Sequence, residues 1–355
     1  MQKTVVVGLS GGVDSSVAAY LLKQQGFKVV GLHMRGENQQ TRQEDENRVK
    51  ELCDKLDIDC VVVDYQDHMK IVKDYFVNEY LAGRTPNPCV VCNKEVKFKP
   101  FLDYMQTLSA DYFATGHYAI VEHNANGTIL KKATDKDKDQ SYFLCKLSNQ
   151  QISKVLFPLG ELTKQQVKQI AQDNNLITKN TKESYDVCFL GSQKFKDFMT
   201  KNYPEKAGNI VDVKTNTILG QHTGISKYTI GQRRGLNIGG KNGFDADRWF
   251  VVKKDIATNT LYVSCGECEE MYSTSCLVKD FNWITKKPLQ DFDCFAKLRY
   301  RQQDQKVQVK LLDDDKVLLK FYTKQRAVTV GQFAVLYSED GTCYGGGTIA
   351  ELFNE

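Results

Sequence analysis

The sequence contains no apolar run that approaches the roughly 20 residues needed to cross a membrane. We expect no secretory leader, because Met1-Gln2-Lys3 runs directly into an apolar, β-branched segment. Long-period repeats and low-complexity tracts are absent as well. These absences argue against a membrane-embedded, secreted or repeat protein, and they predict a cytoplasmic location.

The chain also has no large excess of charge of one sign. The formal net charge is only +4 over 355 residues, although a basic stripe on such a protein can still bind nucleic acid. The length predicts two or three domains, and 41% apolar residues are sufficient for a sizeable core. The 11 cysteines, without a leader, predict mostly buried reduced thiols with a few catalytic or metal-binding ones.

The most informative stretch is a turn rich in glycine and serine, GLSGGVDSS at residues 8–16. It follows a β-branched strand, Thr4–Val7, and precedes a segment with helical apolar spacing, Val17–Gln25. Adjacent glycines allow close approach of a ligand, and the N-terminus of the new helix favours an anion. The turn lacks the Lys of a Walker A loop and carries Asp14 instead. An acid beside phosphates needs a cation, so the turn predicts a phosphate site with Mg²⁺.

The first half of the chain alternates between strand and helix patterns. Expected strands are Lys28–Arg35, Cys60–Asp64 and Tyr112–Thr115, and expected helices are Gln40–Leu56, His68–Leu81, Lys94–Leu108 and Thr163–Asn174. This order predicts a doubly wound parallel α/β sheet whose carboxyl edge holds the ligand. Met34 ends the second strand at this edge, where it could pack against an adenine or could equally be an ordinary core residue. Asn126-Gly127 predicts a hairpin.

Two cysteines, Cys89 and Cys92, follow two prolines in the segment Gly83–Lys94. The prolines predict a rigid loop that ends just before a helix. A thiol near a helix N-terminus, with Lys94 and Lys97 close by, is expected to have a lowered pKa.

The second half of the chain replaces helical periodicity with short strands separated by Gly, Asn and Asp. We predict a small central β domain at 201–273 and a C-terminal β-barrel of about six strands at 274–355, after a catalytic domain at 1–200. Composition alone predicts that the charged stretch Lys131–Gln140 is a solvent-exposed loop.

Six motifs occur together in one family. They are SGGVDS (10–15), GRTPNPCVVCNKEVKF (83–98), ATGHYA (114–119), KDQSYFL (138–144), SYDVCFL (184–190) and YTIGQRRGL (228–236). The chain closely resembles the bacterial tRNA-specific 2-thiouridylases (MnmA type), in the superfamily of N-type ATP pyrophosphatases (PP-loop), over essentially its full length. The resemblance implies an adenine nucleotide alpha hydrolase-like fold. It also implies ATP-dependent 2-thiolation of the wobble uridine in Lys, Glu and Gln tRNAs, with release of AMP and pyrophosphate.

The resemblance also assigns roles to residues. Cys188 would carry a persulfide and Cys92 would be the nucleophile. Either the persulfide attacks the base directly, or Cys92 first releases its sulfur as sulfide. The two thiols would then close a transient Cys92–Cys188 disulfide. The expected ATP contacts are Gly8, Leu9, Ser10, Gly11, Gly12, Val13, Asp14, Ser15, Met34 and Gly116. The expected target-base contacts are Asn87, Pro88 and Cys89, and the expected tRNA contacts are His117, Lys138, Asp139, Gln140, Arg299, Tyr300 and Gln332. A cysteine desulfurase or sulfur-relay protein would supply the sulfur.

Some alternatives remain open at the level of sequence. Some family members carry Asp where this chain has Cys89, so an acid/base role does not transfer to that position. Cys89, Cys92 and Cys188 could instead hold a [4Fe–4S] cluster that carries the sulfur. Cys265 and Cys268 form a C-x-x-C pair far from the first, which favours packing or surface thiols over a zinc site.

Two other functions compete with thiolation. A PP-loop ligase acting on a small molecule would not need Cys92 and Cys188, and an RNA-binding protein that holds ATP structurally would not cleave it. The pair Arg233-Arg234 in the last motif is a candidate phosphate contact, although two arginines in a turn are more often simply solvated.

Overall fold

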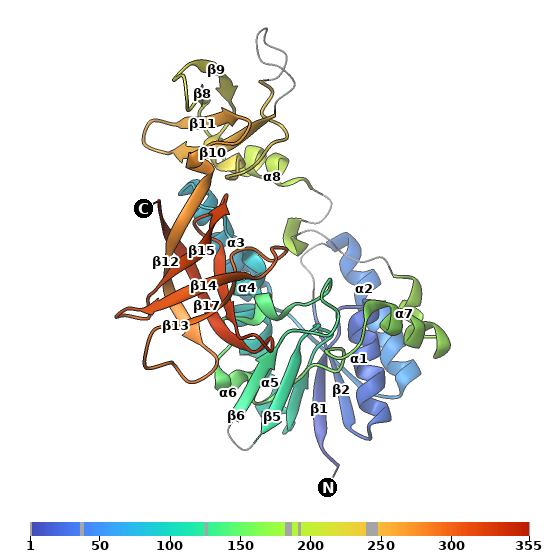
Figure 1. The fold of residues 1–355 in the computed structure, drawn as a ribbon. Coiled ribbons are helices and arrows are strands. Elements are labelled where there is room, and N and C mark those ends of the chain that lie inside the picture. The colour runs from blue at the N-terminus through green and yellow to red at the C-terminus, as the bar shows by residue number, and fades with distance from the viewer. Residues whose placement is uncertain are drawn as a thin grey trace.

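The computed structural model describes residues 2–35, 39–124, 127–181, 187–190, 193–238 and 248–354, apart from the side chains of residues 39–41 and 66. It has three parts: an α/β domain, a small β domain at the far end, and a barrel that packs beside the first (Figure 1). No helix in these ranges is long and apolar enough to cross a bilayer. Asn126 of the expected hairpin, and residues 182–186 and 191 of the stretch around Cys188, lie outside the described residues.

The α/β domain is built on a five-stranded sheet. Its strands are β1 (Thr4–Gly8), β2 (Lys28–Met34), β3 (Asp59–Val63), β4 (Tyr112–Ala114) and β7 (Val155–Leu156). They pair in parallel in the order β3-β2-β1-β4-β7. The chain moves outward from β1 to β2 and β3 and then returns to the other side of β1 at β4. The predicted doubly wound sheet is confirmed, and its switch point lies between β1 and β4.

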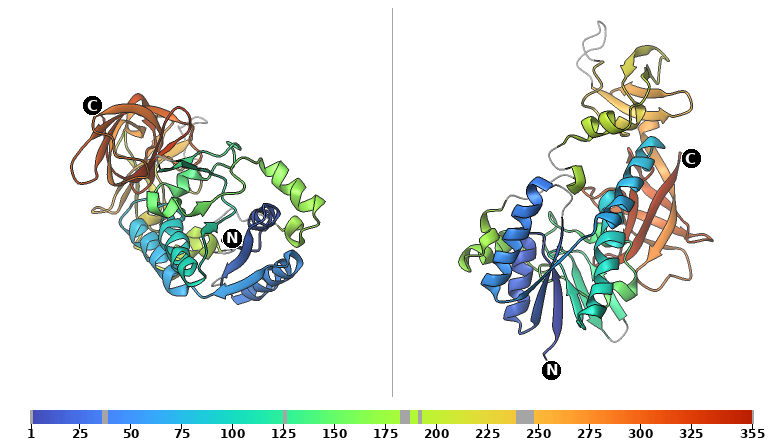
Figure 2. Two further views of the ribbon diagram at one scale, coloured as in Figure 1. Left: turned by 90° about the horizontal axis from the view of Figure 1, so that it is seen from below. Right: turned by 180° about the vertical axis from the view of Figure 1, so that it is seen from behind.

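Helices cover both faces of this sheet (Figure 2). The longer elements are α1 (Val13–Gln24), α2 (Gln39–Leu56), α3 (Gln66–Leu81), a π-helix η1 (Cys92–Phe98), α5 (Lys99–Thr107) and α7 (Lys164–Asp173). The shorter ones are α4 (Pro88–Val91), η2 (Ser141–Leu144), α6 (Asn149–Ile152), η3 (Ile177–Asn180) and η4 (Cys188–Leu190). Val5 and Val7 pack in a cluster with residues of α1, α2 and α7, whereas Val6 packs in another cluster with residues of α5. This double burial explains why β1 is an unbroken apolar run.

A hairpin and the small β domain complete the middle of the chain. The hairpin strands β5 (Ile120–Asn124) and β6 (Gly127–Lys131) pair antiparallel, and α8 (Phe195–Asn202) leads into the small domain. The small domain contains β8 (Gly208–Asp212), β9 (Ile218–His222), η5 (Ile225–Lys227), β10 (Trp249–Asp255), β11 (Thr260–Cys265) and η6 (Glu269–Met271). Its sheet has the order β10-β11-β8-β9.

The C-terminal part is the predicted six-stranded barrel. Its strands are β12 (Tyr272–Trp283), β13 (Phe292–Lys297), β14 (Gln305–Leu311), β15 (Val317–Arg326), β16 (Phe333–Tyr337) and β17 (Cys343–Phe353). They close in the order β12-β15-β14-β13-β16-β17. Phe333 and Val335 of the barrel share one buried cluster with Val6 and Tyr142 of the α/β domain. The two domains therefore pack through a common apolar core.

One local prediction is wrong. Cys89 and Cys92 do not lie in a loop before a helix, because α4 begins at Pro88 and continues through η1 into α5. Proline is favourable at the first position of a helix, where its missing N–H has no partner to lose. The helix therefore starts at the second proline, and both thiols lie within its first turns.

Candidate active site

Serine hydroxyl groups form hydrogen bonds within the turn after β1. The Ser15 hydroxyl accepts a hydrogen bond from the Ser10 backbone N–H at 3.2 Å, and the Ser16 hydroxyl donates to the Gly12 carbonyl at 2.8 Å. Gly11 has a φ of +77°, a conformation that L side chains rarely adopt. Gly12 caps α1 with its backbone only, which leaves the N–H groups of the first helical turn directed toward an anion. The geometry supports the predicted phosphate site.

Gly116 brings the end of β4 against this turn. A Cβ atom added at Gly116 would come within 2.7 Å of both the Asp14 carbonyl carbon and the Ser15 nitrogen. Only glycine fits at that separation, so the structure brings together Gly116 and the turn, which the family resemblance places around ATP.

We expect Gly116→Ala to raise the KM for ATP on the order of tenfold or more, because the added methyl group must displace the phosphate-binding backbone. Steady-state AMP formation measures this effect. Gly220→Ala is the matched control, since a Cβ there meets only the Ile238 side chain, at 3.3 Å. An unchanged KM in Gly116→Ala would show that the turn is not the phosphate site.

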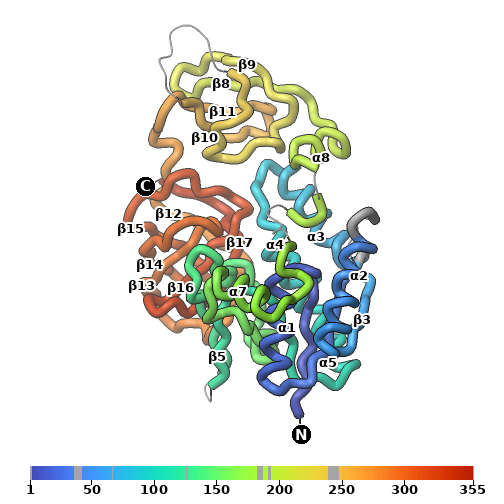
Figure 3. Tube along the Cα trace, turned by 90° about the vertical axis from the view of Figure 1, so that its right-hand side faces the viewer, coloured from blue at the N-terminus to red at the C-terminus, as the bar shows by residue number. Residues whose placement is uncertain are grey.

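Asp14 in this turn is paired with a lysine that the sequence analysis missed. The Lys164 ammonium lies 2.6 and 2.8 Å from the two Asp14 carboxylate oxygens, and the Tyr118 hydroxyl donates to the same carboxylate at 2.9 Å. Lys164 is the first residue of α7, which contacts α1 (Figure 3), and the side chain is only 10% exposed. A lysine at a helix N-terminus interacts unfavourably with the helix dipole. This unfavourable position is the one feature of the sequence that could have suggested a special role for Lys164.

The predicted thiols, Cys89, Cys92 and Cys188, lie on the side of the site where the adenine is expected. Met34, Cys92 and Phe189 pack against the same buried cluster, and Phe189 is the neighbour of Cys188 in η4. Cys89 and Cys188 are close enough to Cys92 that their negative charge would raise its pKa. The structure therefore groups the three predicted cysteines with the predicted adenine contact.

The expectation of a lowered thiol pKa is wrong for Cys92. Burial raises the pKa of Cys92 to about 11, and the nearby Lys97 opposes this shift only in part. The pKa of Cys89 is also raised by desolvation, with Lys97 again opposing. The sequence analysis counted the cations and the helix terminus but not the loss of solvent, which dominates here.

The raised pKa predicts a pH dependence. Only the thiolate reacts, so alkylation of Cys92 by iodoacetamide should increase about tenfold per pH unit from pH 7 up to about 10. The rate can be measured by mass spectrometry of the Cys92 peptide in a Cys89→Ser/Cys188→Ser background, in which burial, the largest cause of the shift, is retained. A plateau between pH 8 and 9 would contradict a raised pKa.

Several predicted tRNA contacts also have partners inside the protein. Arg299 donates to the carbonyls of Ile230 and Ala327 and to the Thr329 hydroxyl. Gln332 donates to the carbonyls of Thr85, at 2.8 Å, and Pro86, at 3.1 Å. A barrel residue thus holds the segment that leads into the cysteine helix.

The remaining predicted tRNA contacts cluster around the charged loop and the end of β4. His117 is buried, and its Nδ1 lies 2.7 Å from the Thr115 hydroxyl; burial lowers the pKa of His117 well below its ordinary value. Asp139 is 3% exposed, and Gln140 pairs with Tyr118. The remaining contacts are Tyr300 and Lys138. The Tyr300 ring lies tilted against Phe143, with 4.3 Å between the ring centroids, and Lys138 lies in the turn before Asp139. Whether these side chains face RNA stays a prediction.

Comparison with known proteins gives a consistent result along the whole chain. Residues 3–192 match the family described as "tRNA methyl transferase HUP domain", residues 196–265 the "tRNA methyl transferase PRC-barrel domain", and residues 273–349 the "Aminomethyltransferase beta-barrel domain". A protein of Mycoplasma capricolum named tRNA-specific 2-thiouridylase MnmA is 46% identical over 378 residues, covering 99% of this chain and 100% of the relative. The chain belongs to the tRNA-specific 2-thiouridylase family.

Two further matches differ in how similar they are to this chain. A protein of the same name from Proteus mirabilis is 44% identical over 364 residues, covering 100% of this chain and 99% of the relative. A solved structure, the U34-tRNA thiolase NcsA from Methanococcus maripaludis with its [4Fe-4S] cluster, is 20% identical with a TM-score of 0.37, covering 57% of this chain and 67% of that one. Membership of a HUP-domain 2-thiouridylase family implies that the chain uses ATP.

Proposed function

We propose that this chain replaces the C2 oxygen of the wobble uridine with sulfur in tRNAs for Lys, Glu and Gln, at the expense of ATP. The observation that carries the proposal is the juxtaposition of two chemistries. The glycine turn at residues 8–16 suits phosphates, while Cys92 packs in one cluster with Met34 and with the neighbour of Cys188. A ligase for small molecules would need the first of these chemistries but not the second.

The first half-reaction activates the base. The uridine O2 attacks the α-phosphorus of ATP, the bond to the β-phosphate breaks, and pyrophosphate leaves. The N–H groups at the start of α1 stabilise the negative charge on the phosphates. Lys164 balances the charge of Asp14 at this point. The base is turned out of the anticodon stack to reach the site, where Asn87, Pro88 and Cys89 at the start of α4 are its expected contacts.

The second half-reaction transfers sulfur. The outer sulfur of a Cys188 persulfide attacks C2 of the adenylated uridine, and the C2–O bond breaks with release of AMP. The Cys92 thiolate then attacks the inner sulfur of Cys188, which frees the thiocarbonyl and leaves a Cys92–Cys188 disulfide. An external thiol reductant must reopen this disulfide before the next turnover. Because burial keeps Cys92 protonated at neutral pH, bound tRNA or ATP must change its surroundings before it attacks.

The residues present do not fit a resident metal ion in this conformation. Among the described ranges, no group of three or more His, Cys, Asp and Glu side chains is arranged to hold one. Both oxygens of Asp14 accept from Lys164, so Asp14 is not free to bind Mg²⁺ directly. Cys89, Cys92 and Cys188, all of which are described, do not form such a group in this conformation. The proposed route therefore uses a persulfide supplied by a cysteine desulfurase or a relay protein, and Mg²⁺ arrives bound to ATP.

A direct assay tests this function. Anaerobically purified protein is incubated with unmodified tRNA, Mg-ATP and either a persulfide-generating desulfurase or sulfide, and the digested nucleosides are analysed by mass spectrometry. We expect 2-thiouridine with the desulfurase, accompanied by AMP and pyrophosphate. ATP cleavage without any thiolated uridine would instead favour a ligase, and no ATP cleavage at all would favour an RNA-binding protein.

A further inference from the structure

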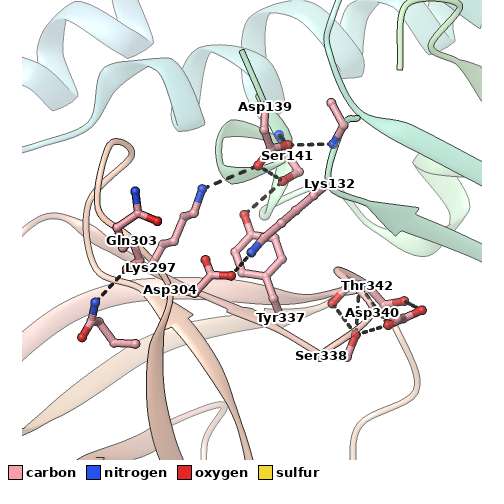
Figure 4. Close-up of polar contacts among 12 residues, drawn as sticks. Lys132, Asp139, Ser141, Lys297, Gln303, Asp304, Tyr337, Ser338, Asp340 and Thr342 are labelled. Atoms are coloured by element: carbon pink, nitrogen blue, oxygen red, sulfur yellow. Dashed lines mark hydrogen bonds and ion pairs between the residues drawn. The ribbon is translucent and has the colours of Figure 1, made fainter. Parts of the chain in front are cut away.

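A buried carboxylate joins the charged loop of the α/β domain to the barrel. Asp139 accepts hydrogen bonds from the backbone N–H groups of Ala133 and Ser141 and from the Ser141 hydroxyl, each at 3.1 Å (Figure 4). The Lys297 ammonium of β13 lies 3.7 Å from the same carboxylate. Asp139 is 3% exposed, so its charge is directed into the protein and away from solvent.

The hydrogen bonds at Ser141 have a defined direction. Its single hydroxyl proton is donated to Asp139, so the Tyr337 hydroxyl, 3.1 Å from the Ser141 oxygen, must be the donor in that second bond. Tyr337 is fully buried in β16. Its ring also lies 4.0 Å from the Lys132 ammonium, which pairs with Asp304 of the barrel. Both ends of the charged loop are therefore fixed to the barrel.

The same loop is bonded to the ATP side of the molecule. Gln140 donates its backbone N–H to the Tyr118 carbonyl at 2.7 Å, and its side chain accepts from the Tyr118 N–H at 2.9 Å. The Tyr118 hydroxyl reaches Asp14 at 2.9 Å. The Lys164 backbone N–H, in turn, donates to Asp135 at 2.8 Å. The loop thus supports both partners of Asp14.

We propose that Tyr337, Ser141 and Asp139 form a latch through which the barrel positions the phosphate-binding turn, and that these three are positioning residues for the ATP-dependent step. The latch is not needed to hold the two domains together, because they already pack through a common apolar core. A buried, fully bonded polar network contributes little net stability but specifies one geometry. Here the geometry specified is that of the loop that carries Gln140 and Asp135. The proposal rests on the function proposed above.

Removing the Tyr337 hydroxyl tests the latch. In Tyr337→Phe the donor to Ser141 is lost while the ring and the apolar core stay. We expect kcat/KM for ATP in AMP formation to fall about tenfold, as for a misplaced binding group, and the affinity for ATP measured by calorimetry to fall with it. Ser141→Ala should have the same effect, and the double variant should be no worse than the more affected single variant, because the pair acts as one unit.

Tyr322→Phe is the matched control, since the Tyr322 hydroxyl bonds Asp293 on the exposed side of the same barrel. The proposal is overturned if Tyr337→Phe and Ser141→Ala behave like this control, or if they weaken tRNA binding while the ATP affinity stays normal. Calorimetry with ATP alone keeps the test separate from the proposed function. If the wild-type enzyme forms no 2-thiouridine, the proposed function is wrong. The latch is tested independently, by the ATP affinity of the variants.

Discussion

Serine in place of Cys188 is expected to abolish 2-thiouridine formation, by at least about three orders of magnitude, because a hydroxyl group cannot carry a persulfide. Cys92→Ser should be equally inactive, since the thiol that releases sulfur from Cys188 is lost. Both variants should still cleave ATP when tRNA is bound, because the phosphate site at residues 8–16 is unchanged. Mass spectrometry of digested tRNA, together with AMP release, measures the two half-reactions separately.

The two cysteines can be told apart by labelled sulfur from a desulfurase. Cys92→Ser should retain the label on Cys188, whereas Cys188→Ser should hold none. Cys265→Ser is a suitable control, because Cys265 lies at the end of β11 in the small domain and is half-buried. Cys89→Ser should remain active if sulfur travels as a persulfide. Loss of activity in Cys89→Ser that is matched by a requirement for cluster reconstitution would replace the persulfide route with a cluster.

Local signals predicted much of the fold. The β-branched run of β1 and the glycine turn appear where the sequence places them, because each is determined by neighbouring residues. The helix after the turn begins at Val13, earlier than the expected Val17. The helix expected at Thr163–Asn174 is likewise present as α7, and Thr163 and Gln166 form a capping box at its start. The closed barrel followed from the spacing of alternating strands and turn residues alone.

Contacts between distant segments could not be predicted in the same way. The pairing of Lys164 with Asp14 joins residues 150 positions apart. The local pattern shows only that Lys164 is unfavourably placed at a helix N-terminus, and it does not identify the partner. Burial of Cys92 depends on helices packed around it, which reversed the expected direction of its pKa shift. Similarly, composition predicted a solvated charged loop at 131–140, yet Asp139 is buried against the barrel. In each case tertiary packing decided the outcome.

Lys164→Ala is expected to lower kcat/KM for ATP by about 30- to 100-fold. Without the ammonium, the Asp14 carboxylate would stand uncompensated beside the α1 N-terminus, where it repels the phosphates. Truncating one partner of a buried, hydrogen-bonded ion pair typically costs about 2–5 kcal/mol, and the lower part of that range applies because the Asp14 side chain is 34% exposed. Steady-state AMP formation with saturating tRNA gives the value. Lys168→Ala, one turn further along the exposed side of α7, is the matched control.

Combining Lys164→Ala with Asp14→Asn tests whether Asp14 binds Mg²⁺ or only needs to be neutralised. If Lys164 serves to neutralise Asp14, then Asp14→Asn/Lys164→Ala removes both charges and should recover a large part of the activity lost in Lys164→Ala alone. If Asp14 instead binds Mg²⁺ after Lys164 moves away, then Asp14→Asn should be inactive whether or not the lysine is present. Helix stability does not confuse the comparison, because replacing a lysine at a helix N-terminus relieves an unfavourable interaction with the dipole. Recovery in the double variant would identify Lys164 as the cation that makes an acid tolerable in this phosphate site.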